Sequence, residues 1–266
     1  RDLHTAYRRQ RQMCIRDRSE ELGGSEKVAR QHEFGKLTIR ERIDLISDRK
    51  SFQEIGKLAG VSKYDDEGEL QSFMPSNFVF GTAEIDGRPI IISGDDFTVR
   101  GGSADASISG KRLQAEGLAN ELRLPHIRLV DGMGGGGSVK TIEMSGRTYI
   151  PRVGGWETII SHLGIAPSVS LALGSVAGIG AARVATSHYS VIVKDTAQMM
   201  IAGPALVDWA SLGDVSKEEL GSSKIHTGNG AIDDEAPSEE AAFEMARNCL
   251  LYTSPSPRDQ RGSRVP

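Results

Sequence analysis

Cysteine is almost absent from this 266-residue chain, and its two copies, Cys14 and Cys249, lie near opposite ends. The sequence between them therefore offers no thiol nucleophile, no cysteine metal cluster and no disulfide. Aromatic residues make up only 5% of the chain, and no run of eighteen apolar residues occurs, which excludes a transmembrane helix. The 38% hydrophobic and 26% charged residues argue against a disordered chain and allow a stable core.

Several catalytic signatures are also missing. There is no H-E-x-x-H or comparable histidine cluster and no G-x-S-x-G, so a zinc protease or an α/β-hydrolase serine is not indicated. A P-loop is excluded because Ser138, not lysine, follows Gly137. We expect a structural role, rather than metal binding or proton transfer, for each of the scattered histidines, namely His126, His162, His188 and His226.

The two ends of the chain carry a pattern of their own. Residues 8–17 back-translate into a transposase-type sequencing adapter, and residues 249–254 into the opposite strand of the same element. Two inverted copies of one DNA element predict that residues 1–18 and 249–266 are adapter-derived, non-native tails. The biological part is then residues 19–248, with both natural termini lost. The alternative is a basic native tail and a Ser/Pro-rich native tail.

The charge balance changes when these tails are set aside. Residues 1–18 hold six basic and two acidic residues, and residues 249–266 hold three and one. The remainder carries 23 basic against 33 acidic residues, a net charge of −10. An acidic protein of this kind is disfavoured as a partner of nucleic acid or of an anionic membrane. A targeting signal cannot be judged without the natural N-terminus.

Strand patterns alternate with helical patterns along the chain. Residues 19–60 are charged and helix-like and form a helical leader, whereas residues 61–77 are polar with scattered Gly and Pro and predict a loop. Asp86-Gly87 is a two-residue hairpin signal. The predicted strands are 78–85, 88–97, 124–130, 167–173, 189–193 and 197–202, and the predicted helices are 104–122, 156–163, one ending at 185, and 237–248. This alternation predicts an α/β fold with repeated β-turn-α units.

Two of the predicted strands end in a glycine-rich turn, Val130–Gly137 and Leu173–Gly180. Glycine allows a ligand to approach main-chain N–H groups closely, and such groups at a helix start suit a phosphate or a developing oxyanion. Two such turns after consecutive strands indicate one composite site. The alternative for each turn is tight strand–helix packing. A dinucleotide fingerprint is not favoured, because the acid expected about 20 residues later would be Glu157, which begins a helix.

Ordered motifs across residues 30–248 carry a family resemblance. Gly35–Leu45 (GKLTIRERIDL) resembles the opening of biotin-dependent acyl-CoA carboxylase β chains, and Asp96–Ser103 (DFTVRGGS) resembles a later family motif. Further segments agree in order and spacing: Ser51–Gly56, Gly174–Ala182, Val193–Thr196, Ala202–Pro204, Glu218–Gly221 and His226–Thr227. The sequence is similar to the N-terminal half of the carboxyltransferase (β) subunit in the propionyl-CoA and methylcrotonyl-CoA carboxylase group.

The resemblance implies a crotonase (ClpP)-like superhelix of β-β-α units. It also implies transfer of a carboxyl group from carboxybiotin, carried by a partner domain, to the carbon beside an acyl-CoA thioester. The negative charge of the intermediate enolate lies on the thioester oxygen, where two backbone N–H donors near ~3 Å stabilise it. Neither a side-chain nucleophile nor a metal bound by this domain is required.

The site residues follow from the two glycine turns. The resemblance places the oxyanion donors in them, and we expect these to be Gly135, Gly136, Gly178 and Ile179. We expect weaker contacts with CoA from Gly134, Gly137, Arg100, Lys111 and Arg112. The first turn departs from the family pattern, since it has four consecutive glycines and lacks the family's arginine, which leaves the acyl group open.

The resemblance also implies partners. These are acyl-CoA, a biotin carboxylase/biotin carrier α subunit and further β subunits, in a hexamer when full length, in the bacterial cytoplasm or the mitochondrial matrix. Because the family's active site lies between the N-half of one chain and the C-half of another, we expect this chain to be inactive alone. Two alternatives stay open: a stand-alone crotonase-type hydratase, isomerase or decarboxylase, for which Glu143 is the nearest candidate acid, and a non-catalytic scaffold.

Overall fold

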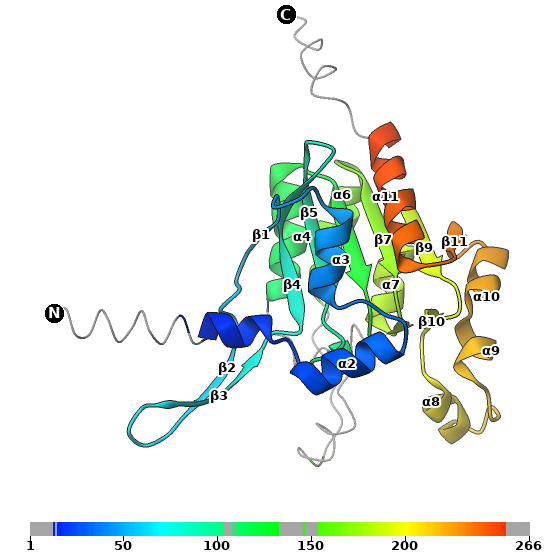
Figure 1. The fold of residues 1–266 in the computed structure, drawn as a ribbon. Coiled ribbons are helices and arrows are strands. Elements are labelled where there is room, and N and C mark those ends of the chain that lie inside the picture. Colours follow the sequence, from blue (N-terminus) through cyan, green and yellow to red (C-terminus); the bar gives the residue numbers. More distant parts are fainter. Residues whose placement is uncertain are drawn as a thin grey trace, which may run out of the picture.

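The computed structural model describes residues 13, 15–103, 108, 110–132, 146 and 154–253. Its centre is a seven-stranded sheet with the order β1-β4-β5-β6-β7-β9-β11 (Figure 1). Strands β5, β6, β7, β9 and β11 run parallel, whereas β4 pairs antiparallel with both β1 and β5. The carboxyl ends of the parallel strands therefore meet at one edge of the sheet.

The main sheet and two small sheets contain all of the named strands. The strands are β1 (Gln53–Glu54), β2 (Gly60–Tyr64), β3 (Leu70–Pro75), β4 (Phe78–Ile85), β5 (Arg88–Asp95), β6 (His126–Val130), β7 (Ser168–Ala172), β8 (Ser175–Ala177), β9 (Tyr189–Val193), β10 (Gln198–Met200) and β11 (Asp234–Ala236). The small sheets are the antiparallel pair β2–β3 and the parallel pair β8–β10.

Helices connect the strands and cover both faces of the main sheet. They are α2 (Ser25–Glu33), α3 (Ile39–Ile46), η1 (Arg100–Gly102), α4 (Lys111–Leu122), α6 (Trp156–Leu163), α7 (Ile179–Ala185), α8 (Pro204–Trp209), α9 (Lys217–Gly221), α10 (Ser223–Gly228) and α11 (Glu239–Thr253). Helices α3 and α11 pack on one face, and α4, α6 and α7 pack on the other (Figure 1). No helix of the described residues has both the length and the apolar character needed to cross a bilayer.

The two faces of the sheet differ in chemistry because side chains alternate along each strand. On β6, Ile127 and Leu129 belong to the main hydrophobic core under α3 and α11. The alternate residues His126 and Arg128 reach Glu116 of α4 on the opposite face. Along β6, the face under α3 and α11 is therefore apolar, and the face under α4 contains buried polar groups.

Several predicted elements are confirmed. The strands at 78–85 and 189–193 and the helix at 156–163 have the predicted bounds. Asp86 and Gly87 join β4 to β5 with φ angles of 51° and 71°. Positive φ at both turn residues matches the right-handed twist of a two-residue hairpin.

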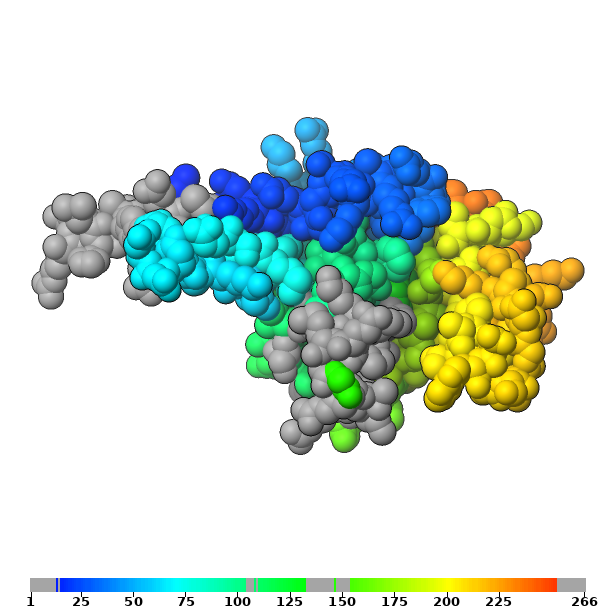
Figure 2. Space-filling view, turned by 90° about the horizontal axis from the view of Figure 1, so that it is seen from below, coloured from blue at the N-terminus to red at the C-terminus, as the bar shows by residue number. Residues whose placement is uncertain are grey.

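The prediction of a loop at residues 61–77 was wrong. This segment contains β2 and β3, an antiparallel hairpin in which Val61 pairs with Met74, and the hairpin extends away from the main sheet (Figures 1 and 2). Val61 and Tyr64 are about half exposed. Because the hairpin lacks a consistently buried face, its sequence lacks the hydrophobic alternation that identifies a half-buried strand.

Two predicted helices have different bounds. The helix predicted at 104–122 begins at Lys111, since Gly110 at its N-cap has a left-handed φ of 86°. The helix predicted at 237–248 begins at Glu239 and continues to Thr253. Within this extension Leu250 is buried in the core and Arg88 donates to its carbonyl oxygen at 3.3 Å. The adapter origin of residues 249–266 stays a prediction.

Candidate active site

Three glycine-bearing turns meet at the carboxyl edge of the sheet. They follow β5, β6 and β7 and contain Gly102, Gly132 and Gly174. A Cβ at Gly102 would lie 2.5 Å from the Asp131 carbonyl oxygen, and one at Gly132 would lie 2.5 Å from that of Gly101. A Cβ at Gly174 would overlap the Asp131 carboxylate. Glycine is required at these positions because the turns touch one another around Asp131.

Asp131 is the centre of a buried set of charges, the charged cluster, formed with Lys36, Arg42 and Glu239. The Asp131 carboxylate accepts from Arg42 Nη1 at 2.9 Å and from Lys36 Nζ at 2.8 Å. Arg42 donates in bidentate fashion to Glu239, at 2.8 and 2.6 Å, and to the carbonyl oxygen of Leu173 at 3.3 Å. The cluster is electrically neutral and links α3 to α11 and to the ends of β6 and β7.

Burial and ion pairing act in opposite directions on Arg42 and Glu239. Burial alone would lower the pKa of Arg42, but Asp131 and Glu239 outweigh that effect and raise it. Burial raises the pKa of the Glu239 carboxyl, although the hydrogen bonds from Arg42 act against this. Bidentate pairing of a guanidinium with a carboxylate is the geometry that best repays desolvation of both groups.

The segment Gly35–Leu45 places both cations of the cluster. Thr38 is the N-cap of α3 and forms a capping box with Glu41: the Thr38 hydroxyl accepts from the Glu41 N–H, and Glu41 accepts from the Thr38 N–H at 2.7 Å. This pattern fixes the start of the helix. Lys36 then precedes the cap, and Arg42 lies on the buried face of the first turns.

A cleft of about 590 Å³ adjoins the glycine turns, a size typical of ligand pockets. Helix α2 and the segments that follow β5, β7 and β9 line it, so it lies outside the carboxyl ends of the strands, where open α/β sheets bind ligands. Lys36 Nζ lies in its wall, 4.2 Å from the ring centroid of Phe97. Five cations line the cleft against the carboxylates of Asp195 and Glu218; the cations are Lys27, Arg30, Lys36, Arg100 and Lys217.

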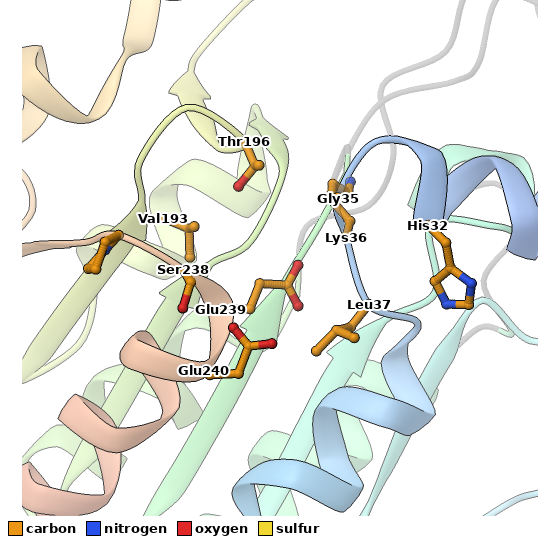
Figure 3. Close-up of a pocket in the computed structure, with 10 residues that line it drawn as sticks. His32, Gly35, Lys36, Leu37, Val193, Thr196, Ser238, Glu239 and Glu240 are labelled. Atoms are coloured by element: carbon orange, nitrogen blue, oxygen red, sulfur yellow. The ribbon is translucent and has the colours of Figure 1, made fainter.

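A second cavity, of about 340 Å³, shares Lys36 and Thr196 with the cleft. Figure 3 shows Glu239 and Glu240 on the α11 side of this cavity, facing the segment that carries Lys36. The Thr196 hydroxyl is buried and has no hydrogen-bond partner among the described residues. The two cavities therefore differ in charge, and Lys36 lies at their junction.

The structure brings the two glycine turns of the sequence together. The Ala177 N–H donates to the Gly132 carbonyl oxygen at 3.3 Å. The Gly178 N–H donates to Met200 O at 2.9 Å, so this amide already has a partner. Ile179 is the first residue of α7, and its amide has no partner among the backbone hydrogen bonds of the described residues. Gly134, Gly135, Gly136, Gly137 and Glu143 lie outside the described residues.

The three cations predicted to contact CoA lie apart. Arg100 lines the cleft. Lys111 is buried near Glu54, and burial lowers its pKa to about 8. Arg112 pairs with Asp95 and its guanidinium carbon lies 4.6 Å from the ring centroid of Phe78, inside the fold. Sequence reasoning missed Lys36 and Arg42 as site residues, although both belong to the Gly35–Leu45 segment that it singled out.

The opposite face of the sheet holds a second buried polar group, the histidine cluster, formed by Glu116, His126, Arg128 and His162. Arg128 donates to Glu116 at 2.9 and 2.8 Å, and His126 Nε2 lies 2.9 Å from the Ser93 hydroxyl. Both ring nitrogens of His162 are buried without a partner among the described residues. Burial lowers the pKa of His162 to about 4. His126 and His162 do not line the cleft, and their structural role stays a prediction.

Comparisons with known proteins place the chain in a family context. Residues 30–266 match the carboxyl transferase domain model. The methylcrotonoyl-CoA carboxylase β chain of Arabidopsis thaliana is 36% identical over 86% of this chain and 38% of its own length. The propionyl-CoA carboxylase carboxyltransferase subunit of Haloferax mediterranei is 29% identical over 90% of this chain and 46% of its own length. The chain thus spans less than half the length of these relatives.

The fold agrees with solved structures. Transcarboxylase 12S, solved as a hexamer with methylmalonyl-CoA bound, has a TM-score of 0.74 and 26% identity, covering 91% of this chain and 46% of that one. The crotonase-like α/β fold expected from the sequence is therefore confirmed.

Proposed function

This chain belongs to the carboxyl transferase domain family, and we propose that it is the N-terminal half of an acyl-CoA carboxyltransferase subunit of a biotin-dependent carboxylase. One observation carries this proposal: three glycine turns converge at the carboxyl edge of the sheet, beside a cleft with a cationic lining. That arrangement offers main-chain donors to an oxyanion and cations to phosphate groups within one site.

The glycine turns would stabilise the enolate of the acyl-CoA. Loss of a proton from the carbon beside the thioester places negative charge on the thioester oxygen, and preorganised N–H groups lower the energy of that charge. The Ile179 amide, the first of α7, is the donor that the described part of the second turn offers, and Gly135 and Gly136 are the proposed donors of the first. Gly178 can contribute only if its hydrogen bond to Met200 is exchanged.

The cleft would bind the CoA moiety. Lys27, Arg30 and Lys217 present charges to its phosphate groups, and Arg100 is the one of the three predicted CoA-binding cations that lines the cleft. Phe34 and Phe97 provide apolar surface in the same wall. Carboxybiotin, brought by a partner subunit, supplies the carboxyl group and the base. Thr196 lines both cavities, and its hydroxyl has no partner among the described residues, which fits a polar group bound at this junction.

An exposed apolar surface on and beside α8 would contact another carboxyltransferase half. Trp209 is 87% exposed, and Ile201, Leu206 and Leu212 are also largely exposed. In Figure 2 residues 201–212 belong to the yellow area at the right of the molecule. An apolar patch of this kind on a globular chain marks an interaction surface. A full-length hexamer of β subunits with a biotin-bearing α subunit would bury it.

The first experiment is calorimetric titration of CoA into the purified chain. We expect saturable binding that weakens as salt is added, because the contacts are ionic. Arg30→Glu should weaken the affinity by about tenfold, whereas Arg49→Glu, an exposed residue outside the cleft lining, should change it less than about twofold. Absence of CoA binding by the unaltered chain would overturn the proposal.

A second experiment measures carboxylation of propionyl-CoA by free carboxybiotin. We expect no turnover by the chain alone and recovery when the C-terminal half of a related β subunit is added. Hydration or decarboxylation of an acyl-CoA by the chain alone would instead favour a stand-alone crotonase-type enzyme.

A further inference from the structure

One residue of the charged cluster, Asp131, touches all three glycine turns. The Asp131 carboxylate lies where a side chain of Gly174 would be, and its carbonyl oxygen lies where one of Gly102 would be. The Asp131 N–H donates to Asp95 Oδ2 at 3.3 Å, at the end of β5, and the next residue is Gly132. A shift of Asp131 would therefore move the turns after β5, β6 and β7 together.

We propose that Lys36 and Arg42 are positioning residues that act through Asp131 to hold the three turns in register. For its effect on catalysis this role rests on the proposed carboxyltransferase function, whereas its effect on the turns does not. Neither cation needs to touch a reacting atom: both hold the Asp131 carboxylate in place, Arg42 through Oδ2 and Lys36 through contacts with both oxygens.

Arg42 is the most rigidly held cation of the charged cluster. Its side chain is completely buried and donates to groups on three elements: Asp131 after β6, Leu173 after β7 and Glu239 on α11. A planar guanidinium with several donors holds its partners at fixed angles, which a lysine ammonium in its place would not do. Arg42 therefore sets the distance between the β6 and β7 turns.

Lys36 supplies the part that faces the ligand. Its ammonium has three donors and binds Asp131, and the residue lines both the cleft and the second cavity, which contains Glu239 and Glu240. The ring of Phe97, from the segment after β5, lies 4.2 Å from Nζ. Lys36 therefore ties the β5 segment to Asp131 at the wall of the cleft.

Hydrogen–deuterium exchange of the ligand-free chain tests the inference directly. We expect Lys36→Met and Arg42→Met to speed exchange by about tenfold in peptides that cover residues 96–103, 127–132 and 171–178. Lys36→Arg should restore most of the protection, because it keeps the charge and the donors. If Arg42→Met fails to fold, Lys36→Met alone decides, since its side chain is the less buried of the two.

Arg128→Met is the matched control, because Arg128 makes an equally buried bidentate pair with Glu116 on the opposite face of the sheet. It should lower the melting temperature without raising exchange in the turns after β5 and β7. Faster exchange in all three turns of this control, or none in the Lys36 variant, would overturn the positioning role.

A kinetic measurement separates this inference from the proposed function. In a carboxylase reconstituted with the C-terminal half, Arg42→Lys should lower kcat by about tenfold and leave KM within about twofold, since Arg42 does not line the cleft. A raised KM with unchanged kcat would contradict positioning. Failure of the unaltered chain to bind CoA would refute the proposed function and leave the exchange result to decide this inference.

Discussion

The two buried polar clusters lie on opposite faces of the same sheet and differ in how completely they are satisfied. In the charged cluster, Arg42 and Asp131 each meet partners of opposite charge on both sides. In the histidine cluster, both nitrogens of His162 are buried without partners among the described residues. The same holds for the hydroxyls of Ser168 and Ser170 on the neighbouring strand β7. Each ion of the charged cluster has a partner that holds its position. In the histidine cluster Arg128 and Glu116 are also paired, but the buried groups without a partner fix no geometry and cost free energy.

The cluster with paired charges lies where the candidate active site needs a fixed backbone geometry. The charged cluster adjoins the three glycine turns and the cleft, and the histidine cluster lies beneath α4 and α6, away from them. We therefore expect substitutions in the charged cluster to lower the free energy of unfolding more than substitutions in the histidine cluster. We also expect them to disturb the structure near the glycine turns.

Removing the centre of the charged cluster should have the largest effect. Asp131→Ala leaves Lys36 and Arg42 buried with one carboxylate between them, and it should lower the free energy of unfolding by about 3–5 kcal/mol. Urea denaturation measures this loss. The control Asp44→Ala, on the exposed side of α3, should stay within about 0.5 kcal/mol of the unaltered chain. Equal losses in the two variants would remove the contrast between the clusters.

A side chain placed against the charged cluster should have the next largest effect. Gly174→Ala puts a Cβ into the Asp131 carboxylate and close to Lys36 Nζ, so it should cost about 1–3 kcal/mol. Gly117→Ala, in α4 with no atom near its Cβ position, should instead stabilise the chain by about 0.5–1 kcal/mol. Thermal unfolding of both variants gives the comparison. A stabilised Gly174→Ala would show that Asp131 and Lys36 move aside at little cost in free energy.

Acid should act on the histidine cluster. Burial lowers the pKa of His162 to about 4, so between pH 6.5 and pH 4 the unfolded chain binds a proton that the folded chain does not. The free energy of unfolding is therefore unaffected by His162 above pH 6.5 and decreases as the pH is lowered, by up to about 3 kcal/mol near pH 4.

His162→Leu is the variant that isolates this effect. It should flatten the pH dependence of unfolding between pH 6.5 and pH 4, measured as urea midpoints, relative to the unaltered chain. An unchanged slope would mean that His162 is not the group that titrates. A change confined to pH above 7 would also contradict this prediction.

The smallest effect should come from an unpartnered hydroxyl. Ser170→Ala removes a buried oxygen that makes no hydrogen bond among the described residues. The free energy of unfolding should stay constant or rise by up to about 1 kcal/mol, because a buried unsatisfied group costs free energy. Differential scanning calorimetry suffices to detect this. A clear loss of stability would mean that Ser170 binds an ordered water. The buried polar groups on this face would then have more hydrogen bonds than the protein atoms alone provide.

Local sequence patterns predicted much of the fold. The Asp86-Gly87 turn, strand β9 and helix α6 follow from turn chemistry and periodicity within a few residues. The hairpin at residues 61–77 did not, because exposed strands without a consistently buried face carry no alternation. The family followed from ordered motifs, and its oxyanion donors beyond the described residues remain predictions.

The site was harder to predict because its polar contacts join residues far apart in the chain. Lys111 and Arg112 stand at the start of a helix near a glycine turn, yet both point into the fold. Lys36 and Arg42 lie about 90 residues before Asp131 and look like an ordinary solvated helix face. Their burial depends on sheet order and on the direction of α3, which spacing within one segment does not reveal.

The pair between Arg42 and Glu239 also affects how the molecule forms. Their sequence separation is 197 residues, and they join α3 to α11. Contacts of such separation pay a large loop-closure entropy and form late in folding. During synthesis Arg42 emerges long before its partners, so its guanidinium stays in water until α11 has been made. The three glycine turns would then acquire their final register only in the last step of folding, so that a chain truncated before α11 would collapse around its sheet without assembling the site.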